Sequence, residues 1–228
     1  RLVGAGMISP FNMDDAVSEA RRCAEQLGFR AAFLRDNPLV DHQWQSAYYD
    51  PLWSALEDLN MSLGFHESTG TGRNQVGERL EPNFMLRRVF AQPIEQMLAL
   101  GCFCGGGVFA RHPKLRVAFL EANCSWLPWL LWRLDEAWEL DGDVWAPDVK
   151  EKPSAYFKRH CVVSIEPDEM IANNVLQQVG NGNLVFSTDY PHVDSRYPEA
   201  INHFLRLPFS DDDKRKILWD NCARYYAM

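Results

Sequence analysis

Ionisable side chains directly follow five apolar segments of strand length in this sequence. They are Arg35 with Asp36, His66 with Glu67, Glu121, Glu166 and Asp189. Because the carboxyl ends of parallel strands meet at one edge, where α/β proteins bind their ligands, we expect these side chains to line one pocket. A histidine and carboxylates gathered there can hold a metal ion, which lowers the pKa of a bound water to about 7. The alternative role at each position is that of a turn former or a helix cap.

His66 and Asp189 have the most specific candidate chemistry. A neutral imidazole after a buried strand can bind a metal ion, and its alternative role is that of a core histidine bonded to a backbone carbonyl. The Asp189 carboxylate, in the segment Ser-Thr-Asp-Tyr-Pro-His at residues 187–192, can share the metal ion and accept a proton from its bound water. Its alternative role is that of an Asx-turn residue before Pro191.

Other candidates have weaker signals. Glu121 is a candidate metal ligand, acid, base or partner of an arginine. Glu166 precedes Pro167 and leads into a predicted helix, so the chemistry of a helix N-terminus accounts for it. His112, in an Arg-His-Pro-Lys segment, is predicted to face solvent. Four tryptophans recur at helical spacing and are predicted to pack in the core: Trp126, Trp129, Trp132 and Trp138.

The elements that position these residues alternate along the chain. Short apolar runs predict strands at residues 2–8, 30–34, 62–65, 115–120, 161–165 and 184–187. Amphipathic spacing and capping residues predict helices at 13–27, 51–59, 168–179, 198–205 and 210–226. This alternation predicts an α/β fold, with a parallel sheet covered by helices.

About six strand–helix units are counted, and two folds accommodate them. One is a six-stranded doubly wound sheet. The other is a TIM-like (β/α)8 barrel that lacks its first units, since a closed barrel has eight. No GxGxxG or Walker pattern follows any predicted strand, which disfavours a nucleotide-binding doubly wound sheet.

The composition limits the partners of the protein. The chain has 228 residues, 46% of them hydrophobic, and a net charge of −8. This length predicts one domain over residues 1–228, and the negative charge argues against binding to nucleic acid or to an anionic membrane. The longest apolar run recognised, at 126–134, is interrupted by Pro128 and Arg133 and is too short to span a membrane. We therefore expect a small-molecule substrate, and a homodimer remains open.

Six cysteines are present, at positions 23, 102, 104, 124, 161 and 222, without a repeated metal-binding spacing. They are predicted to be free thiols in a reducing, cytoplasmic setting, since no signal peptide is visible. The chain opens at Arg1 within an apolar run and without an initiator Met, so we expect an N-terminal part to be missing.

Several segments resemble the amidohydrolase-related family, the branch of the amidohydrolase superfamily that includes aminocarboxymuconate-semialdehyde decarboxylase and γ-resorcylate decarboxylase. They are GFHE at 64–67, LRVAFLEAN at 115–123, WLPWLL at 126–131 with RLD at 133–135, FSTDYPH at 186–192 and KILWDNCA at 216–223. The resemblance spans nearly the whole chain, and the order and spacing of the segments carry it.

The resemblance implies a metal-dependent barrel that acts as a hydrolase or non-oxidative decarboxylase on small, often aromatic, acids. His66 matches the family's mid-barrel histidine ligand and Asp189 its last-strand aspartate. Two departures stand out. The family's first-strand HxH or ExH motif is absent, and decarboxylase members carry a histidine where Glu121 stands, followed by glycines where residues 122–124 stand.

A mechanism follows as a hypothesis. A zinc ion, or Mn²⁺ or Fe²⁺, polarises a water, Asp189 takes its proton, and Glu121 delivers a proton to the leaving group or carbanion. Arg35 clamps a substrate carboxylate and His192 enters the pocket. The rival interpretations are a catalytically inactive barrel serving as a binding or structural subunit, and an oxidoreductase or transferase on a doubly wound sheet.

Overall fold

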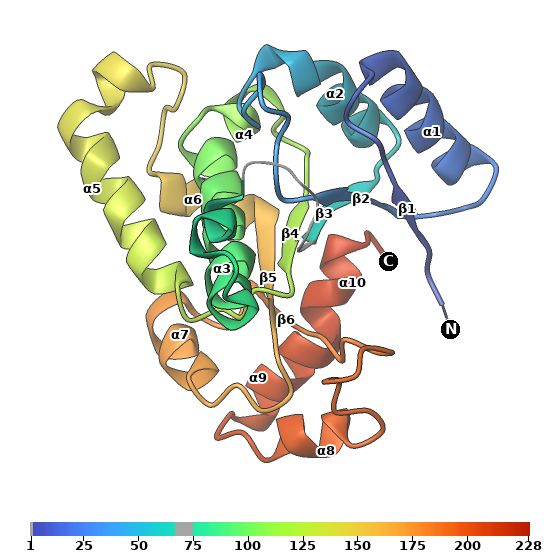
Figure 1. Cartoon of the computed structure of the whole chain (residues 1–228), viewed down its shortest axis with the longest axis vertical. Helices are drawn as coiled ribbons and strands as arrows, with labels where there is room; N and C mark the ends of the chain where they lie inside the picture. The colour runs from blue at the N-terminus through green and yellow to red at the C-terminus, as the bar shows by residue number, and fades with distance from the viewer. Residues whose placement is uncertain (1, 67–74) are drawn as a thin grey trace.

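The computed structural model describes residues 2–66 and 75–228, so Glu67 lies outside the described residues. Its centre is a six-stranded parallel sheet in the order β1-β2-β3-β4-β5-β6 (Figure 1). The strands are β1 (Ala5–Met7), β2 (Ala31–Arg35), β3 (Ser62–His66), β4 (Val117–Leu120), β5 (Cys161–Ile165) and β6 (Leu184–Phe186). All six predicted strands are confirmed, with ends that shift by up to three residues.

The strand order distinguishes the two candidate folds. Each strand pairs with its neighbour in sequence, so the chain never reverses its direction of travel across the sheet. A doubly wound sheet needs such a reversal, whereas a barrel adds its strands in sequence. The doubly wound alternative is therefore wrong, and the six strands follow barrel order.

The helices confirm most of the predicted pattern and add two long segments to it. They are α1 (Met13–Glu25), α2 (Asp50–Asp58), α3 (Phe84–Cys104), α4 (Val108–Arg111), α5 (Leu127–Trp145), α6 (Pro153–His160), α7 (Ala172–Val179), α8 (Ala200–Leu205), α9 (Asp211–Arg215) and α10 (Asn221–Tyr225), with 3-10 turns η1 (Ala47–Tyr49) and η2 (Val76–Leu80). No helix was predicted over α3, α4 or α6, and over α5 only the helical spacing of the tryptophans was noted. Pro93 lies inside α3, where proline is normally excluded. The predicted helix at 210–226 is divided by a π-helical turn, η3 (Lys216–Asp220).

The two faces of the sheet have different coverings. Side chains alternate along each strand, so Leu34, Phe65 and Phe119 face the main core, which also contains residues of α1 to α7. On the opposite face, Ala118 and Val162 pack against Tyr225 of α10 and other nearby residues. Figure 1 shows α1, α2, α5 and α7 around one side of the sheet and α10 on the other.

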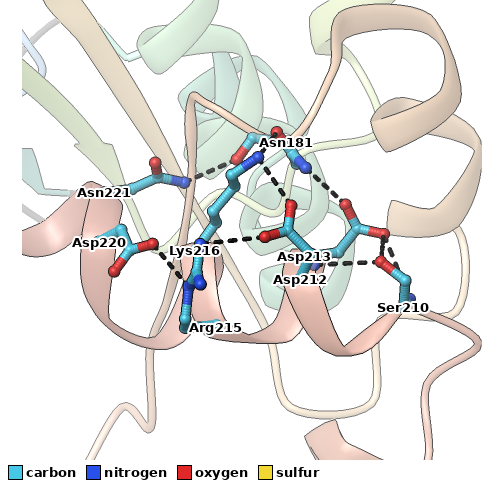
Figure 2. Close-up of polar contacts among 8 residues, drawn as sticks. All are labelled: Asn181, Ser210, Asp212, Asp213, Arg215, Lys216, Asp220 and Asn221. Carbon is cyan, nitrogen blue, oxygen red and sulfur yellow. Dashed lines mark hydrogen bonds and ion pairs between the residues drawn. The ribbon is translucent and has the colours of Figure 1, made fainter.

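The C-terminal helical segment is fixed to the start of β6. Figure 2 shows the contacts, in which Asn221 Nδ2 donates to the carbonyl of Asn181 at 2.7 Å. The same amide also donates to the carbonyl of Leu184 at 2.7 Å. Asn181 Nδ2 in turn donates to Asp213 at 2.6 Å, and Asp213 forms a capping box with Ser210 at the start of α9. These bonds attach the start of β6 to the C-terminal helices. Asp189 follows the other end of this strand.

Several expectations about single elements need correction. Trp126 and Trp138 pack against the core as predicted, but Trp129 and Trp132 are each 55% exposed. His112 is buried rather than solvated, because its two ring nitrogens lie 3.2 Å from Asp50 and 3.3 Å from Glu57, which are distant in sequence.

One helical stretch, residues Phe84–Arg111, is long and apolar enough to cross a membrane by length and composition, although the longest apolar run noted in the sequence lies at 126–134. Half of its most apolar window is buried inside the structure, as expected for a core helix of a folded protein. The prediction that the protein has no membrane partner stays a prediction.

His160 gives the fold a pH dependence that can be measured. Its Nδ1 lies 3.0 Å from the Leu115 carbonyl and its Nε2 accepts from Arg159 at 3.2 Å, so the contacts require the neutral ring. Burial lowers the pKa of His160 below its ordinary value of 6.5. Between its folded-state pKa and pH 6.5, the unfolded chain binds a proton that the folded chain does not. The free energy of unfolding therefore decreases as the pH is lowered through this range, by up to about 1.4 kcal/mol per pH unit.

We expect His160→Asn, which retains a donor for the Leu115 carbonyl, to reduce this slope in urea unfolding between pH 6.5 and 5.5. The lost ring contact with Phe109 lowers stability at every pH, so the slopes and not the absolute values are compared. Equal slopes in the variant and the wild type would contradict the prediction.

Candidate active site

Strand register brings Arg35 and His66 to the same level of the sheet. The two residues are paired across β2 and β3, two positions beyond the Phe33–Gly64 pair. Paired residues of parallel strands project to the same face, so both side chains lie on the face opposite the main core. The Phe33 ring packs edge-on against His66, with ring centroids 5.5 Å apart.

Glu121 lies beside His66 at the end of the next strand. Its Oε2 is 2.9 Å from His66 Nε2, and its side chain is 16% exposed. The Glu121 backbone N–H donates to Ser164 Oγ of β5 at 3.1 Å. Its φ angle is 60°, a left-handed conformation that costs a non-glycine residue about 1–3 kcal/mol. The surrounding contacts, such as the bond to Ser164, keep the Glu121 backbone in this unfavourable conformation.

Asp189 and His192 extend the cluster from the loop after β6. Asp189 also has a positive φ, of 52°, and its N–H donates to Ser187 Oγ at 3.3 Å. Its carbonyl accepts from the backbone N–H of His192 at 2.9 Å, which turns the chain back. No hydrogen bond within residues 2–66 and 75–228 reaches the Asp189 carboxylate, so the predicted alternative of an Asx turn is not observed. One ligand atom each of Glu121, Asp189 and His192 lie within 4.8 Å of one another.

The cluster concentrates negative charge. Burial, followed by the charge of Glu121, raises the pKa of Asp189. Burial and then Asp189 raise the pKa of Glu166 to about 7. Glu166 precedes α7 by six residues, so the predicted helix N-terminus does not account for it. Among the described residues, neither lysine nor arginine forms an ion pair with Glu121, Glu166 or Asp189.

These donors fit a divalent metal ion. Carboxylate oxygens and imidazole nitrogens suit Zn²⁺, Mn²⁺ and Fe²⁺, and the ligand atoms of Glu121, Asp189 and His192 are close enough for one ion to reach with small movements. The predicted ligands His66 and Asp189 both lie next to Glu121, His66 by direct contact and Asp189 within this cluster. Carboxylates without cationic side chains beside them also provide the charge that a bound cation would neutralise.

A cleft of about 490 Å³ opens beside the cluster. Its wall includes the predicted residues Arg35, His66, Glu121 and His192, together with Phe33, Met7, Phe84, Arg88, Gln92, Val193 and Asp194. Arg88 of α3 forms an ion pair with Asp194. Arg35 forms no hydrogen bond or ion pair with any described residue, so its half-buried guanidinium is available to an anion in the cleft.

Two buried residues that sequence reasoning missed support the site. Gln96 of α3 donates from Nε2 to Asp36 Oδ2 at 3.1 Å and to the Leu120 carbonyl at 3.2 Å, so it joins the ends of β2 and β4. Glu169 accepts from the backbone N–H groups of Cys124 at 2.9 Å and of Glu166 at 3.2 Å, which joins the loops after β4 and β5. Neither residue follows a strand, so no local pattern marks it.

Comparison with known proteins gives one family and several distant relatives. The family model described as Amidohydrolase (Amidohydro_2) matches residues 1–228. A 2-amino-3-carboxymuconate-6-semialdehyde decarboxylase from Dictyostelium discoideum is 23% identical over 233 residues, which cover all of this chain and 62% of that protein. The chain thus spans somewhat less than two thirds of the length of this curated relative.

Two solved structures show the same fold. The crystal structure of 5-carboxyvanillate decarboxylase LigW from Sphingomonas paucimobilis has a TM-score of 0.85 and 22% identity, and covers 100% of this chain and 67% of that one. A dihydroxybenzoic acid decarboxylase from Polaromonas sp. JS666, solved with bound manganese and the inhibitor 2-nitroresorcinol, has a TM-score of 0.75 and 20% identity over 95% of this chain and 66% of that one. With the strand order, this likeness confirms the predicted barrel-type α/β fold.

Gln96→Leu tests the connection beneath the site. The variant removes the bonds that Gln96 donates to the buried Asp36 carboxylate and to the Leu120 carbonyl, so we expect the free energy of unfolding to fall by about 2–4 kcal/mol. Gln177→Leu makes the same change at an exposed position of α7 and should alter stability by less than about 0.5 kcal/mol. Urea unfolding measures both. Equal effects at the two positions would show that Gln96 does not support the strand ends.

Proposed function

Because this chain belongs to the amidohydrolase family, we propose that it is a metal-dependent carboxy-lyase that removes CO₂ from a small aromatic carboxylic acid. The relative from Dictyostelium and the two solved structures carry names of decarboxylases, two of which act on carboxylated phenols by name. Hydrolysis of a related acid is the alternative within the same family, since Glu121 stands where the decarboxylases carry a histidine.

One observation carries this proposal: the cleft combines a guanidinium that has no partner among the described residues and a cluster of metal-binding donors. Arg35 lines the same cleft as His66 and Glu121. A guanidinium binds a carboxylate bidentately, whereas the donors at the other side suit a cation. The rings of Phe33 and Phe84 also line the cleft and offer apolar contact to an aromatic ring.

The residues that line the site have distinct proposed roles. A divalent cation, when bound, polarises the oxygen atoms it holds and lowers their pKa values. His66 and Asp189 are the ligands that the family resemblance implies. Arg35 orients the substrate carboxylate, and Asp189 is the proposed acceptor of a proton from a water in the site. Phe33 limits the access of water to His66 from one side.

The cluster argues against the alternative of a catalytically inactive subunit. A purely structural barrel has no need to hold Glu121 and Asp189 in costly backbone conformations. It also has no need to gather carboxylates without lysine or arginine partners within the described chain. We extend the proposal to a reducing, cytoplasmic setting, since all six cysteines are free thiols.

Metal dependence and CO₂ release test the function. We expect the purified protein, supplied with Mn²⁺, to release CO₂ from at least one acid in a panel of hydroxybenzoates and carboxylated methoxyphenols. Removal of the ion with a chelator should abolish the release, and Mn²⁺ should restore it. Zn²⁺, the ion predicted from the sequence, is compared in the same assay. Metal-independent release, or none across the panel with metal-loaded protein, would contradict the proposal.

Arg35→Lys tests carboxylate binding. Lysine retains the charge but loses the bidentate geometry, so about 1.5 kcal/mol of binding is lost and kcat/KM should fall roughly tenfold or more, mainly through KM. Arg21→Lys, on the exposed face of α1, is the matched control and should leave both constants unchanged. An unchanged KM in Arg35→Lys would show that the substrate carboxylate binds elsewhere.

A further inference from the structure

We propose that Arg88 of α3 is a positioning residue, which holds the loop after β6 in place through its ion pair with Asp194. This loop, residues 187–197, carries Asp189 and His192. The inference rests on the proposed function, because the loop supplies two side chains of the candidate site. It gives Arg88 a role in the arrangement of the site rather than in direct contact with the substrate.

The loop after β6 has no anchor in the hydrophobic core. From Ser187 to Glu199 no side chain is buried, and Val193 is fully exposed. The next buried residue is Ala200, where α8 begins. Because segments with few buried apolar contacts open easily, the position of this loop depends on its polar contacts.

Hydrogen bonds within the loop make it one compact unit. The His192 N–H donates to the Asp189 carbonyl at 2.9 Å, and the Ser195 N–H donates to the His192 carbonyl at 3.1 Å. Ser195 Oγ donates to the Thr188 carbonyl at 2.7 Å, which closes the unit. Asp194 belongs to this unit, so a displacement of Asp194 also moves Asp189 and His192.

Two ion pairs connect this unit to other elements of the described chain. Asp194 pairs with Arg88 of α3. Arg196 pairs with Asp168, in the loop after β5, at 3.0 Å. Arg88 and Asp194 both line the cleft, whereas the residues of the second pair do not. The Arg88–Asp194 pair is therefore the contact that joins α3 to the loop across the cleft.

α3 is itself fixed to the strand that leads to Glu121. Gln96 Nε2 donates to the carbonyl of Leu120, the residue before Glu121, at 3.2 Å. Arg88 and Gln96 are eight positions apart, or about 12 Å along an α-helix. One helix thereby connects the two parts of the site, which are the end of β4 and the loop after β6.

This connection matters because strand pairing does not set the distance between the two parts. β5 lies between β4 and β6 in the sheet, yet one ligand atom each of Glu121, Asp189 and His192 lie within 4.8 Å of one another. A misplacement of about 1 Å in a positioned group can lower a rate by up to about 100-fold. The ion pair thus acts on catalysis through the position of the loop.

Hydrogen–deuterium exchange of the whole protein, without substrate, tests whether Arg88 holds the loop. The bonded amides of His192 and Ser195 report its opening. We expect Arg88→Gln and Asp194→Asn each to accelerate exchange in residues 187–199 by about two- to fivefold, as expected for the loss of a half-exposed ion pair. The double variant should exchange no faster than Arg88→Gln, because both changes remove the same contact. Arg88→Lys, which retains the charge, should exchange more slowly than Arg88→Gln.

Arg22→Gln is the matched control. It breaks an ion pair with Glu19 on α1, in which the side chains are 47% and 36% exposed, against 50% and 46% for Arg88 and Asp194. Exchange in residues 187–199 and activity should both equal those of the wild type. Salt at about 1 M, which shortens the Debye length to about 3 Å, should accelerate loop exchange in the wild type but not in Arg88→Gln.

Turnover of an acid from the panel tests the effect on catalysis. Arg88→Gln and Asp194→Asn should lower kcat by a similar factor, of about threefold or more, with KM changed by less than about twofold. Arg88→Lys should recover part of the lost kcat. A guanidinium that binds the substrate directly predicts a different pattern, in which KM rises in Arg88→Gln and kcat is unchanged in Asp194→Asn.

The contrary outcomes are distinct. Wild-type exchange of residues 187–199 in both single variants overturns the inference and leaves the proposed function standing. The pattern of direct substrate binding also overturns it. Absence of turnover across the panel contradicts the proposed function, while exchange still decides whether Arg88 holds the loop.

Discussion

The meeting of carboxylates at one edge of a parallel sheet is the constraint on which the candidate site depends. Glu121, Glu166 and Asp189 end three neighbouring strands, and burial together with their mutual repulsion raises the pKa of Glu166 and of Asp189. Such an arrangement is unfavourable unless protons or a cation compensate it. The fold stabilises it with bonds to backbone groups: Ser164 holds Glu121, Ser187 holds Asp189, and Glu169 holds the N–H of Glu166. One carboxylate oxygen each of Glu121 and Asp189 lie within 4.8 Å of each other.

The rest of the architecture separates this edge from the hydrophobic core. One face of the sheet carries the large side chains that pack against α1 to α7, so most of the hydrophobic core lies away from the face that bears the site. On that second face, the small residues Gly64 and Ala118 leave room for Tyr225 of α10. The Tyr225 side chain packs over this part of the sheet. An added Cβ at Gly64 would lie 3.3 Å from Leu120 and 3.7 Å from the Tyr225 hydroxyl. The open part is thereby limited to the strand ends, where Arg35 and His66 lie.

The sequence predicted the sheet and the position of the site because both follow from local patterns. Short apolar runs mark β2 to β6, and the next charged residue marks each strand end. The supporting residues have no such mark. Gln96 lies in α3, and Pro93 within this segment argues against a helix in the sequence pattern. Its partners Asp36 and Leu120 are 60 and 24 residues away along the chain. His112 is buried because Asp50 and Glu57, more than 50 residues earlier, provide its partners. Contacts of this range come only from the folded chain.

The proposed binding of an aromatic acid depends on the separation of opposite charges within one cleft. Arg35 would neutralise Glu121 if the two met, yet no ion pair forms between them although both line the cleft. The β2–β3 register fixes Arg35 beside His66, and His66 occupies the side of Glu121 that faces it. In the order of the strands, His66 of β3 lies between Arg35 of β2 and Glu121, which follows β4. Under the proposed function, an acid whose carboxylate binds at Arg35 would have its other end directed toward the metal donors.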